Sequence, residues 1–508
     1  MSQDKAVASA TAPGGRDTTG RSDSRRWLAL AVIALAQLMV VLDATVVNIA
    51  MPSAQQALHI SDADRQWIVT AYTLTFGGLL LLGGRVADYF GRKRAFLIGL
   101  IGFAAASALG GAASNAATLF AARGLQGAFG ALLAPAALSL LTVTFTEARE
   151  RARAFGVFGA ISGGGAAIGL IAGGLLTEYA NWRWCLLVNI PVALLAFAAA
   201  VPLVRESRAD GDTRYDIPGA VLATAGLAAL VYGFTKAATE ADHWGSTTTI
   251  TWLVVAAALL AAFGWWESRT ANPLLPPRVL LDRNRGGSYL VSILIGSGMM
   301  GMFLFMTYYL QLTLGYSALR SGVAYLPFSA GIIFAAGLAS QLLPRFGPRV
   351  LMTVGGVLAT VSMAWLTQLD LHSSYVTHIL PSFVGISVGM GLMFVPLSST
   401  ALSGVGNHDA GVASAMVNTT QQVGGSLGTA LLNTIFTTAV AGYATSHGTG
   451  PAALADGAIH GYNVAFTASA LLLATGAVLV VLLIRRPVEA AASGADTPAR
   501  VAEPALMH

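Results

Sequence analysis

One carboxylate, that of Asp43, lies deep within a long apolar run of the sequence. Arg123 is the one cation inside such a run, and Gln126 follows three positions later, on the same helix face. An ionisable group within a membrane is energetically costly and marks a functional site by default. A carboxylate held between desolvation and a nearby cation can bind and release a proton near neutral pH. These residues therefore predict proton exchange; alternatively, Asp43 is a static polar contact and Arg123 bonds to backbone carbonyls.

Residues suited to contact with an apolar ligand are spread over three apolar runs. Methionine and aromatic surfaces adapt to varied ligands, and a few polar groups orient them. The same residues also suit lipid contact, core packing or hydrogen bonds between helices. The candidates are Asn48, Met302, Phe305, Tyr309, Asn418, Gln421 and Gln422.

The composition requires a membrane environment for these residues. Of the 508 residues, 55% are hydrophobic and 10% charged, whereas soluble domains carry about 25% charged residues. An ordinary soluble enzyme, a disordered protein and a single-pass receptor are thereby excluded. The single cysteine, Cys185, excludes an intramolecular disulfide and a cysteine-ligated metal cluster, and we expect no metal site. The net charge of +5 does not indicate nucleic acid, because the positions of the basic residues matter more.

Fourteen apolar runs are long enough to cross a bilayer as helices, which need about 20 residues each. They do not alternate between apolar and polar residues, so a β-barrel is disfavoured. Residues 1–26 and 486–508 are expected to be disordered cytoplasmic tails, without a cleavable signal peptide. The runs are 27–50, 66–84, 95–113, 118–141, 154–176, 184–204, 217–237, 250–266, 288–310, 321–343, 350–368, 375–398, 412–438 and 461–484.

The basic residues predict the orientation of these spans. Of the 29 lysines and arginines, 24 fall on the side that carries both termini, 4 on the opposite side and 1 within a span. Because basic residues concentrate in cytoplasmic loops, both termini are expected in the cytoplasm.

A weak internal repeat indicates how the spans are grouped. The loop at 85–93 reads RVADYFGRK, and the loop at 341–349 reads QLLPRFGPR, with Phe-Gly aligned at an offset of 256 residues. Each loop is the second cytoplasmic loop of a six-span half. The repeat predicts an all-α membrane protein with six-helix bundles at 27–204 and 288–485, and two inserted helices with flanking loops at 205–287. Repeated halves around a midplane site are common in secondary transporters.

Several segments together resemble the major facilitator superfamily, and in particular its fourteen-span drug:proton antiporter branch. The resemblance covers about residues 27–485, and the first-span segment combined with fourteen spans is its most specific part. The segments are 42–52 (LDATVVNIAMP), 83–94 (GGRVADYFGRKR, resembling motif A), 123–127 (RGLQG, resembling motif B), 181–184 (NWRW) and 189–191 (NIP).

The resemblance implies roles for motif residues. In motif A, Asp88 would contact a helix of the other half in the outward-open state, with Arg92 bracing it and Gly83 and Gly91 allowing close approach and a tight turn. Motif B, at Arg123, is associated with proton transfer. Some relatives use a carboxylate in span 10 for divalent cations; the run at 321–343 has none, so the resemblance implies neutral, zwitterionic or monovalent cationic apolar substrates. The span-5 antiporter motif keeps its glycines for close helix packing at the interface between the two halves, but has leucine in place of proline, so span 5 should be straighter. These positions are Gly165, Gly169, Gly173, Gly174 and Leu170.

The sequence thus predicts a proton-coupled transporter that exports small hydrophobic drugs or antibiotics across the bacterial cytoplasmic membrane. It would be a monomer in the lipid bilayer, would exchange substrate for protons, would need no cofactor and would not be an enzyme. No Walker-type phosphate loop is present, which disfavours ATP-driven transport. The alternatives are a dedicated exporter of a self-made antibiotic or metabolite, a proton-coupled uptake symporter, and a non-transporting membrane sensor or scaffold.

Overall fold

The computed structural model describes residues 18–208, 216–240, 243–271, 273–275, 280–403, 410–448 and 450–485. Within those ranges the chain forms helices and short connections, with no strand. The predicted tails at 1–17 and 486–508 lie outside them. Residues 18–26, expected to be disordered, belong instead to the first helix, where Arg26 pairs with Glu150 at 3.1 Å. The first bundle therefore begins earlier than the composition of its N-terminal segment indicated.

The N-terminal bundle has six helical passes, the last of them made of two consecutive helices. Small residues on α2, α3 and α4 allow close packing, and their buried apolar side chains form one core with α1 and α7. Asn115 caps α4 by accepting a hydrogen bond from the backbone N–H of Thr118. The helices are α1 (Thr18–Ala57), α2 (Trp67–Phe90), α3 (Arg92–Gly111), α4 (Ala116–Thr144), α5 (Ala148–Tyr179), α6 (Trp184–Leu187) and α7 (Asn189–Leu203).

Two inserted helices, α8 (Ile217–Thr239) and α9 (Thr247–Glu267), pack against each other as a hairpin. Each begins with a capping side chain, Asp216 for α8 and Ser246 for α9. A short 3₁₀ turn, η1 (His243–Gly245), precedes α9. Helix α8 contacts α2 of the first bundle and α15 of the second, so the hairpin touches both halves.

The C-terminal bundle contains the remaining helices and includes a large aromatic core. Its elements are α11 (Arg283–Tyr308), η2 (Tyr309–Thr313), α12 (Ala318–Ala324), α13 (Leu326–Trp365), η3 (Leu366–Gln368), η4 (Tyr375–Ile379), α14 (Leu380–Leu402), α15 (Ala410–His447) and α16 (Pro451–Leu483).

The described helices give fourteen crossings, as the sequence predicts. Twelve helical segments are long and apolar enough to span a bilayer. One of them, Ala318–Gln368, has 51 residues and bends at Gly347 between Pro344 and Pro348, so it crosses twice. The 32-residue helix α5 adds one more crossing.

The weak repeat corresponds to a shared backbone conformation. Gly91 separates α2 from α3 with φ of 127°, and Gly347 divides α13 with φ of 76°. Positive φ favours glycine, because it has no Cβ to clash with the backbone. The aligned Phe-Gly pairs therefore mark equivalent turns in the two halves.

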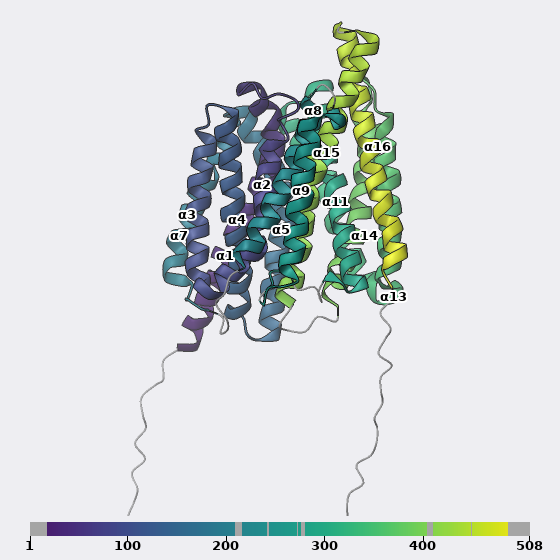
Figure 1. Cartoon of the computed structure of the whole chain (residues 1–508). Coiled ribbons are helices and arrows are strands. Elements are labelled where there is room, and N and C mark those ends of the chain that lie inside the picture. Colours follow the sequence, from purple (N-terminus) through teal and green to yellow (C-terminus); the bar gives the residue numbers. More distant parts are fainter. Residues whose placement is uncertain are drawn as a thin grey trace, which may run out of the picture.

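Helix α1 begins and α16 ends at the same end of the molecule, at the bottom of Figure 1. We call this end the terminal end and the opposite one the far end. Hydrogen bonds join the two bundles at the far end: Gln311 Nε2 donates to the Ile49 carbonyl at 2.9 Å, and the Leu319 N–H donates to Glu178 Oε2 at 2.9 Å.

Candidate functional site

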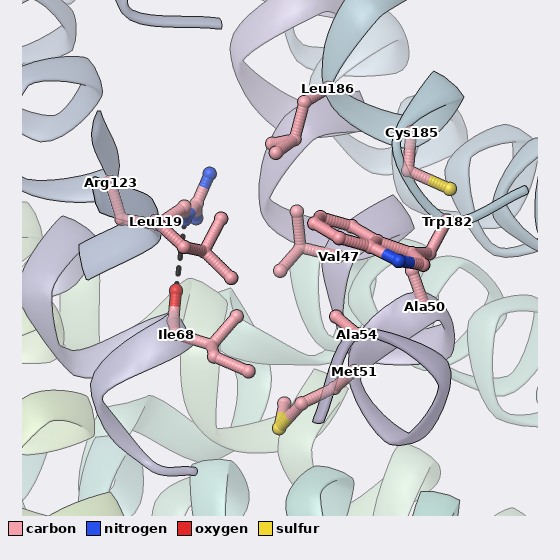
Figure 2. Close-up of a pocket in the computed structure, with 10 residues that line it drawn as sticks. All are labelled: Val47, Ala50, Met51, Ala54, Ile68, Leu119, Arg123, Trp182, Cys185 and Leu186. Atoms are coloured by element: carbon pink, nitrogen blue, oxygen red, sulfur yellow. Dashed lines mark hydrogen bonds between the residues drawn. The ribbon is translucent and has the colours of Figure 1, made fainter. Parts of the chain in front are cut away.

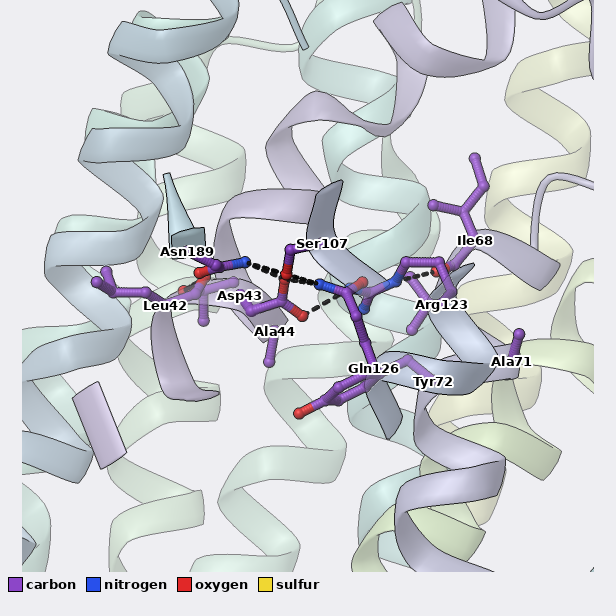
Figure 3. A network of polar contacts seen from close by, with 12 residues as sticks. Leu42, Asp43, Ala44, Ile68, Ala71, Tyr72, Ser107, Arg123, Gln126 and Asn189 are labelled. Atoms are coloured by element: carbon purple, nitrogen blue, oxygen red, sulfur yellow. Dashed lines mark hydrogen bonds and ion pairs between the residues drawn. The ribbon is translucent and has the colours of Figure 1, made fainter. Parts of the chain in front are cut away.

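The Asp43 carboxylate lies inside the N-terminal bundle, where the residue is 1% exposed. Its Oδ2 accepts a hydrogen bond from Arg123 Nη1 at 2.6 Å. Its Oδ1 accepts from Gln126 Nε2 at 2.9 Å and from Asn189 Nδ2 at 2.8 Å (Figure 3). Each of these partners supplies an N–H donor, an arrangement suited to an ionised carboxylate.

Arg123 makes both kinds of contact that its sequence position suggested. Besides the pair with Asp43, its Nε donates to the Ile68 carbonyl at 2.9 Å, and Nη1 donates to Gln126 Oε1 at 2.8 Å. Its guanidinium carbon lies 4.5 Å from the ring centre of Tyr72. A buried ion pair is tolerated only when further hydrogen bonds satisfy the charged groups. The structure therefore brings Asp43, Arg123 and Gln126 into one network.

Two members of this network were not among the predicted site residues. Asn189, on α7, bonds to Asp43, and Ser107 Oγ on α3 accepts from Gln126 Nε2 at 2.7 Å. Asn189 belongs to the Asn-Ile-Pro segment that contributes to the family resemblance, so a signal for it existed. Ser107 has no such signal, because a serine in an apolar run usually bonds to its own helix.

The second glycine of the RGLQG segment lets α4 approach α2 at the level of the network. A Cβ at Gly127 would lie 2.3 Å from the Tyr72 carbonyl oxygen and 2.1 Å from Thr75 Oγ1. No side chain fits there. The spacing of the segment therefore places Arg123 and Gln126 toward the bundle interior while Gly127 forms the helix contact.

A small cavity of about 10 Å³ is lined in part by Arg123 (Figure 2). This volume is close to the space that one water molecule needs. Most of its lining is apolar, including Val47, Leu119 and Trp182, and Arg123 itself is 1% exposed. The charged pair is thus shielded from solvent on this side.

The motif A residues occupy the turn between α2 and α3. Arg92 Nε donates to Asp88 Oδ1 at 2.9 Å, and Gly91 has the positive φ expected of a tight turn. A Cβ at Gly83 would lie 2.1 Å from a carbonyl oxygen of α4. Glu206, which the sequence did not single out, accepts hydrogen bonds from the backbone N–H groups of residues 93 and 94. The predicted contact of Asp88 with the other half remains a prediction for the outward-open state.

The glycines of α5 face two partners. A Cβ would come within 3.0 Å of Leu38 Cδ1 at Gly165, 1.9 Å of Thr45 Oγ1 at Gly169 and 2.9 Å of the Val46 carbonyl oxygen at Gly173. These three glycines therefore pack against α1 within the first bundle, and the prediction that they lie at the interface between the halves is wrong for them. Gly174 packs against α12 of the second bundle, where its Cβ would lie 2.6 Å from the backbone of Leu319.

Helix α5 is continuous through the position where the antiporter motif has proline. It runs from Ala148 to Tyr179, and Leu170 is buried within it. A leucine keeps the backbone N–H that proline lacks, which accounts for the unbroken helix.

Three of the residues proposed for substrate contact are buried in the second bundle. Met302, Phe305 and Tyr309 are fully buried. Phe305 stacks on Phe436 with ring centres 5.1 Å apart, and the Tyr309 hydroxyl donates to the Asp370 carbonyl at 2.6 Å. In this conformation they form part of the packed core.

The other four candidates lie on α1 and α15. Asn48 is 7% exposed, and its Nδ2 donates to the carbonyl of Ala44 on its own helix. On α15, Asn418 is exposed, whereas Gln421 and Gln422 are partly buried. A Cβ at Gly77 of α2 would lie 2.9 Å from the Gln422 Cβ. Gln422 thus sits where α2 meets α15, between the two bundles.

The two bundles share an equivalent turn and are joined at the far end, and one of them contains a buried ion pair. This arrangement is that of a secondary transporter. The chain matches the model of the Major Facilitator Superfamily over residues 33–429 and belongs to this superfamily, whose members are generally non-enzymatic carriers.

Three relatives were compared in sequence. The chain is 53% identical to the puromycin resistance protein of Streptomyces alboniger, over 94% of this chain and 96% of that one. It is 40% identical to the cephamycin export protein of Amycolatopsis lactamdurans, over 83% and 87%. It is 34% identical to a multidrug efflux pump of Mycolicibacterium smegmatis, over 83% of each.

A solved structure supports the fold assignment. The bacterial homologue of the human lysosomal transporter Spinster, crystallised in an inward-facing, unoccupied conformation, superposes with a TM-score of 0.65. The match covers 91% of this chain and 97% of that one at 18% identity. This likeness concerns the fold alone.

Proposed function

We propose that this protein exports small hydrophobic antibiotics or drugs across the cytoplasmic membrane in exchange for protons. The observation that carries the proposal is the buried Asp43–Arg123 pair with its Gln126 and Asn189 donors. Proton binding at Asp43 would neutralise the carboxylate, break the pair with Arg123 and replace one acceptor by a donor. The protonated and ionised forms therefore require different packing of α1 against α4 and α7.

The coupling between proton and substrate is indirect in this proposal. Asp43 lies within the first bundle, so a substrate between the bundles would not touch its carboxylate. Helix α1 carries Asp43, contacts α11 and α12 of the second bundle and packs against the glycines of α5. A change in how α1 packs around Asp43 would thus alter the contact between the bundles. The proton gradient would supply the driving force, without a cofactor.

The orientation follows from the distribution of basic residues. By the count along the sequence, 24 of the 29 lysines and arginines fall on the side that carries both termini, against 4 on the opposite side. We therefore assign the terminal end to the cytoplasm and the far end to the outside. In the conformation described here, the bundles are joined at the outer end.

The relatives guide the choice of substrate. Two are named for resistance to or export of a single antibiotic, puromycin and cephamycin, and one is named a multidrug efflux pump. Puromycin is the first compound to test, because the puromycin resistance protein matches almost the whole chain at 53% identity. Transport of puromycin alone would favour a dedicated exporter, whereas transport of unrelated dyes as well would favour multidrug efflux.

The proposal is tested in everted membrane vesicles with an imposed proton gradient. Wild-type vesicles should accumulate puromycin when the lumen is acidic, and Asp43→Asn vesicles should not. Asp456→Asn is the matched control, because Asp456 is an exposed aspartate of α16. Equal accumulation by the wild type and Asp43→Asn would contradict the role of Asp43, and accumulation that ignores the gradient would contradict antiport.

A further inference from the structure

A second buried arginine, Arg65, lies at the outer end in the connection between α1 and α2. It is 2% exposed, although the connection that carries it is short. Its Nη1 lies 3.3 Å from Asp62 Oδ1, but the Asp62 side chain is 65% exposed. A surface carboxylate compensates a buried charge only weakly, because solvent screens it. The cation must therefore be stabilised by other groups.

Those groups come from the second bundle. The guanidinium carbon of Arg65 lies 4.1 Å from the ring centre of Tyr308 on α11 and 4.8 Å from that of Phe436 on α15. Phe305 contributes a third ring at 6.0 Å. We call Tyr308, Phe436 and Phe305 the aromatic box. Aromatic faces attract cations, and arginine in particular stacks on them.

Asn433 of α15 fixes the connection from both directions. Its Oδ1 accepts a hydrogen bond from Arg65 Nε at 3.1 Å. Its Nδ2 donates to the backbone carbonyls of Asp62 at 2.8 Å and Ala63 at 3.2 Å. A further bond joins the hydroxyl of Tyr308 to the side chain of Gln55 on α1. Every one of these contacts runs between the first bundle and the second.

An open cleft of about 450 Å³ lies on the outer side of this contact. Tyr308 of the aromatic box and Asp62 line it, together with Gln55 and Leu312. The cleft therefore lies between the first bundle and the second, and the ring of Tyr308 borders both the cleft and the guanidinium of Arg65.

We propose that Arg65 and the aromatic box form the outer gate of the transporter: the guanidinium seated in the box holds the outer end closed and must withdraw before substrate can leave. This inference rests on the proposed function, since it assumes that the bundles separate at the outer end. Withdrawal returns Arg65 to water, where its charge is hydrated, so the contact can be broken without leaving a buried cation unpaired. Arg65 is a positioning residue for the cycle and does not touch the proton site.

The gate is tested by measuring distances between spin labels in purified protein. One pair, at Ala57 and Ala441, reports the outer ends of the two bundles, and a second pair, at Arg205 and Gln341, reports their cytoplasmic ends; all four positions are exposed. Each is changed to cysteine in a Cys185→Ala background, because Cys185 is the single native cysteine. Arg65→Met and Phe436→Leu remove the cation and one ring of the box.

Both variants should shift the outer pair toward longer distances and the cytoplasmic pair toward shorter ones, with the ratio of closed to open outer ends lowered about tenfold. Arg65→Lys should give a smaller shift, because lysine keeps the charge but lacks the planar guanidinium. The matched control is Arg320→Met: Arg320 also stacks on an aromatic ring, Tyr316 at 3.8 Å, but it is exposed and both residues belong to the second bundle. The control should leave both distances unchanged.

Unchanged distances in folded Arg65→Met would overturn the gate. If Arg65 had only a structural role, Arg65→Met would broaden the distance distributions of both label pairs and lower the thermal stability. The outer distance would not lengthen while the cytoplasmic distance shortens, and that result would also overturn the gate. If Arg65→Met does not fold, Phe436→Leu, which keeps the cation, decides between these outcomes. The gate and the proposed function fail separately: a reciprocal shift without gradient-driven transport by the wild type would leave the gate in place and refute proton antiport.

Discussion

The Asp43 carboxylate is held by three N–H donors at a depth that solvent does not reach. A charged pair in such a place has a large desolvation cost, which its partners must offset. Removal of one charge is therefore more damaging than removal of both. This asymmetry allows the pair to be tested by its effect on folding as well as on transport.

Arg123→Met should lower the free energy of unfolding by about 3 kcal/mol, because it leaves Asp43 buried and uncompensated. Combining it with Asp43→Asn should restore most of the lost stability but not transport, since the charge has gone from both positions. Thermal unfolding of the detergent-solubilised protein measures both variants. A double variant as unstable as Arg123→Met would show that Arg123 stabilises the fold independently of Asp43.

Asn189→Ala should reduce proton-driven efflux about tenfold, because it removes one hydrogen bond to the Asp43 carboxylate, a change of about 1.4 kcal/mol. Asn181→Ala is the control, because Asn181 is exposed and bonds only to the nearby backbone of Arg183. Initial rates of efflux at equal protein levels compare the two. An equal effect of both substitutions would exclude a specific role for Asn189.

The sequence was sufficient to single out Asp43 and Arg123, because charged residues within apolar runs are rare and costly. It was not sufficient to identify Ser107, or the burial of Arg65. The partner of a polar side chain in a helix depends on how neighbouring helices are rotated, and no periodicity within one run records that rotation. Arg65 falls in a connection on the side poor in basic residues, where a cation is expected to be exposed to water.

Helix contacts in this protein depend on glycines that face backbone of another helix. At Gly83 a Cβ would lie 2.1 Å from the Ala131 carbonyl oxygen, whereas at the adjacent Gly84 the nearest atom would be a Pro135 side-chain carbon at 3.5 Å. The first distance is impossible without moving α2 away from α4, and the second is an ordinary contact.

Gly83→Ala should therefore reduce stability and transport, whereas Gly84→Ala should leave both near wild type or stabilise the helix slightly, by up to about 1 kcal/mol. Melting temperature and efflux rate, measured side by side, distinguish the two. If the two substitutions proved equally harmless, the close contact between α2 and α4 described here would be wrong.

The contact between α5 and α12 at the outer end depends on Glu178 and can be tested by changing the pH. Hydrogen bonds from Ser317 and from the Leu319 N–H lower the pKa of Glu178 below its ordinary value of 4.5. A lowered pKa means that the ionised contact is complete above pH 4.5 and is lost as the pH falls through the lowered value. The label pair at Ala57 and Ala441 should thus report no Glu178-dependent opening between pH 7 and pH 5.

Glu178→Gln serves as the control for this prediction, because its amide oxygen can accept the Leu319 hydrogen bond at any pH. If the distance between the two labels increased fully by pH 5 in the wild type but not in Glu178→Gln, the pKa of Glu178 could not be lowered, and the prediction would be contradicted.

The number and order of the membrane crossings could be predicted from the sequence, because apolar length determines whether a helix spans a bilayer. The weak sequence repeat also indicated that the turns at Gly91 and Gly347 are equivalent. The start of α1 was not, since residues 18–26 are polar and their helix packs through Arg26 on Glu150 of α5. Likewise, three of the α5 glycines pack on α1 and only Gly174 contacts the other half. The spacing of the glycines along the sequence does not predict which neighbouring helix each of them contacts.

In the described part of the chain, the contact between the two bundles at the far end is separate from the buried Asp43 site. The inserted hairpin joins them: Gln66 Nε2 on the first bundle's side donates to Thr235 of α8 at 2.7 Å, and Thr434 of α15 donates to the Phe234 carbonyl at 2.8 Å. Helix α8 therefore contacts both bundles at the far end. In this account a proton at Asp43 alters the packing of α1, and the outer contact then opens or closes.

The central claim is that Asp43 exchanges a proton when substrate binds. The most direct measurement adds puromycin to purified protein in weakly buffered detergent solution, at each of a series of pH values, and records proton release with a pH-sensitive dye. We predict release by the wild type and by Asp456→Asn, and none by Asp43→Asn. Release of the same size from Asp43→Asn, or binding by the wild type without release, would contradict the account.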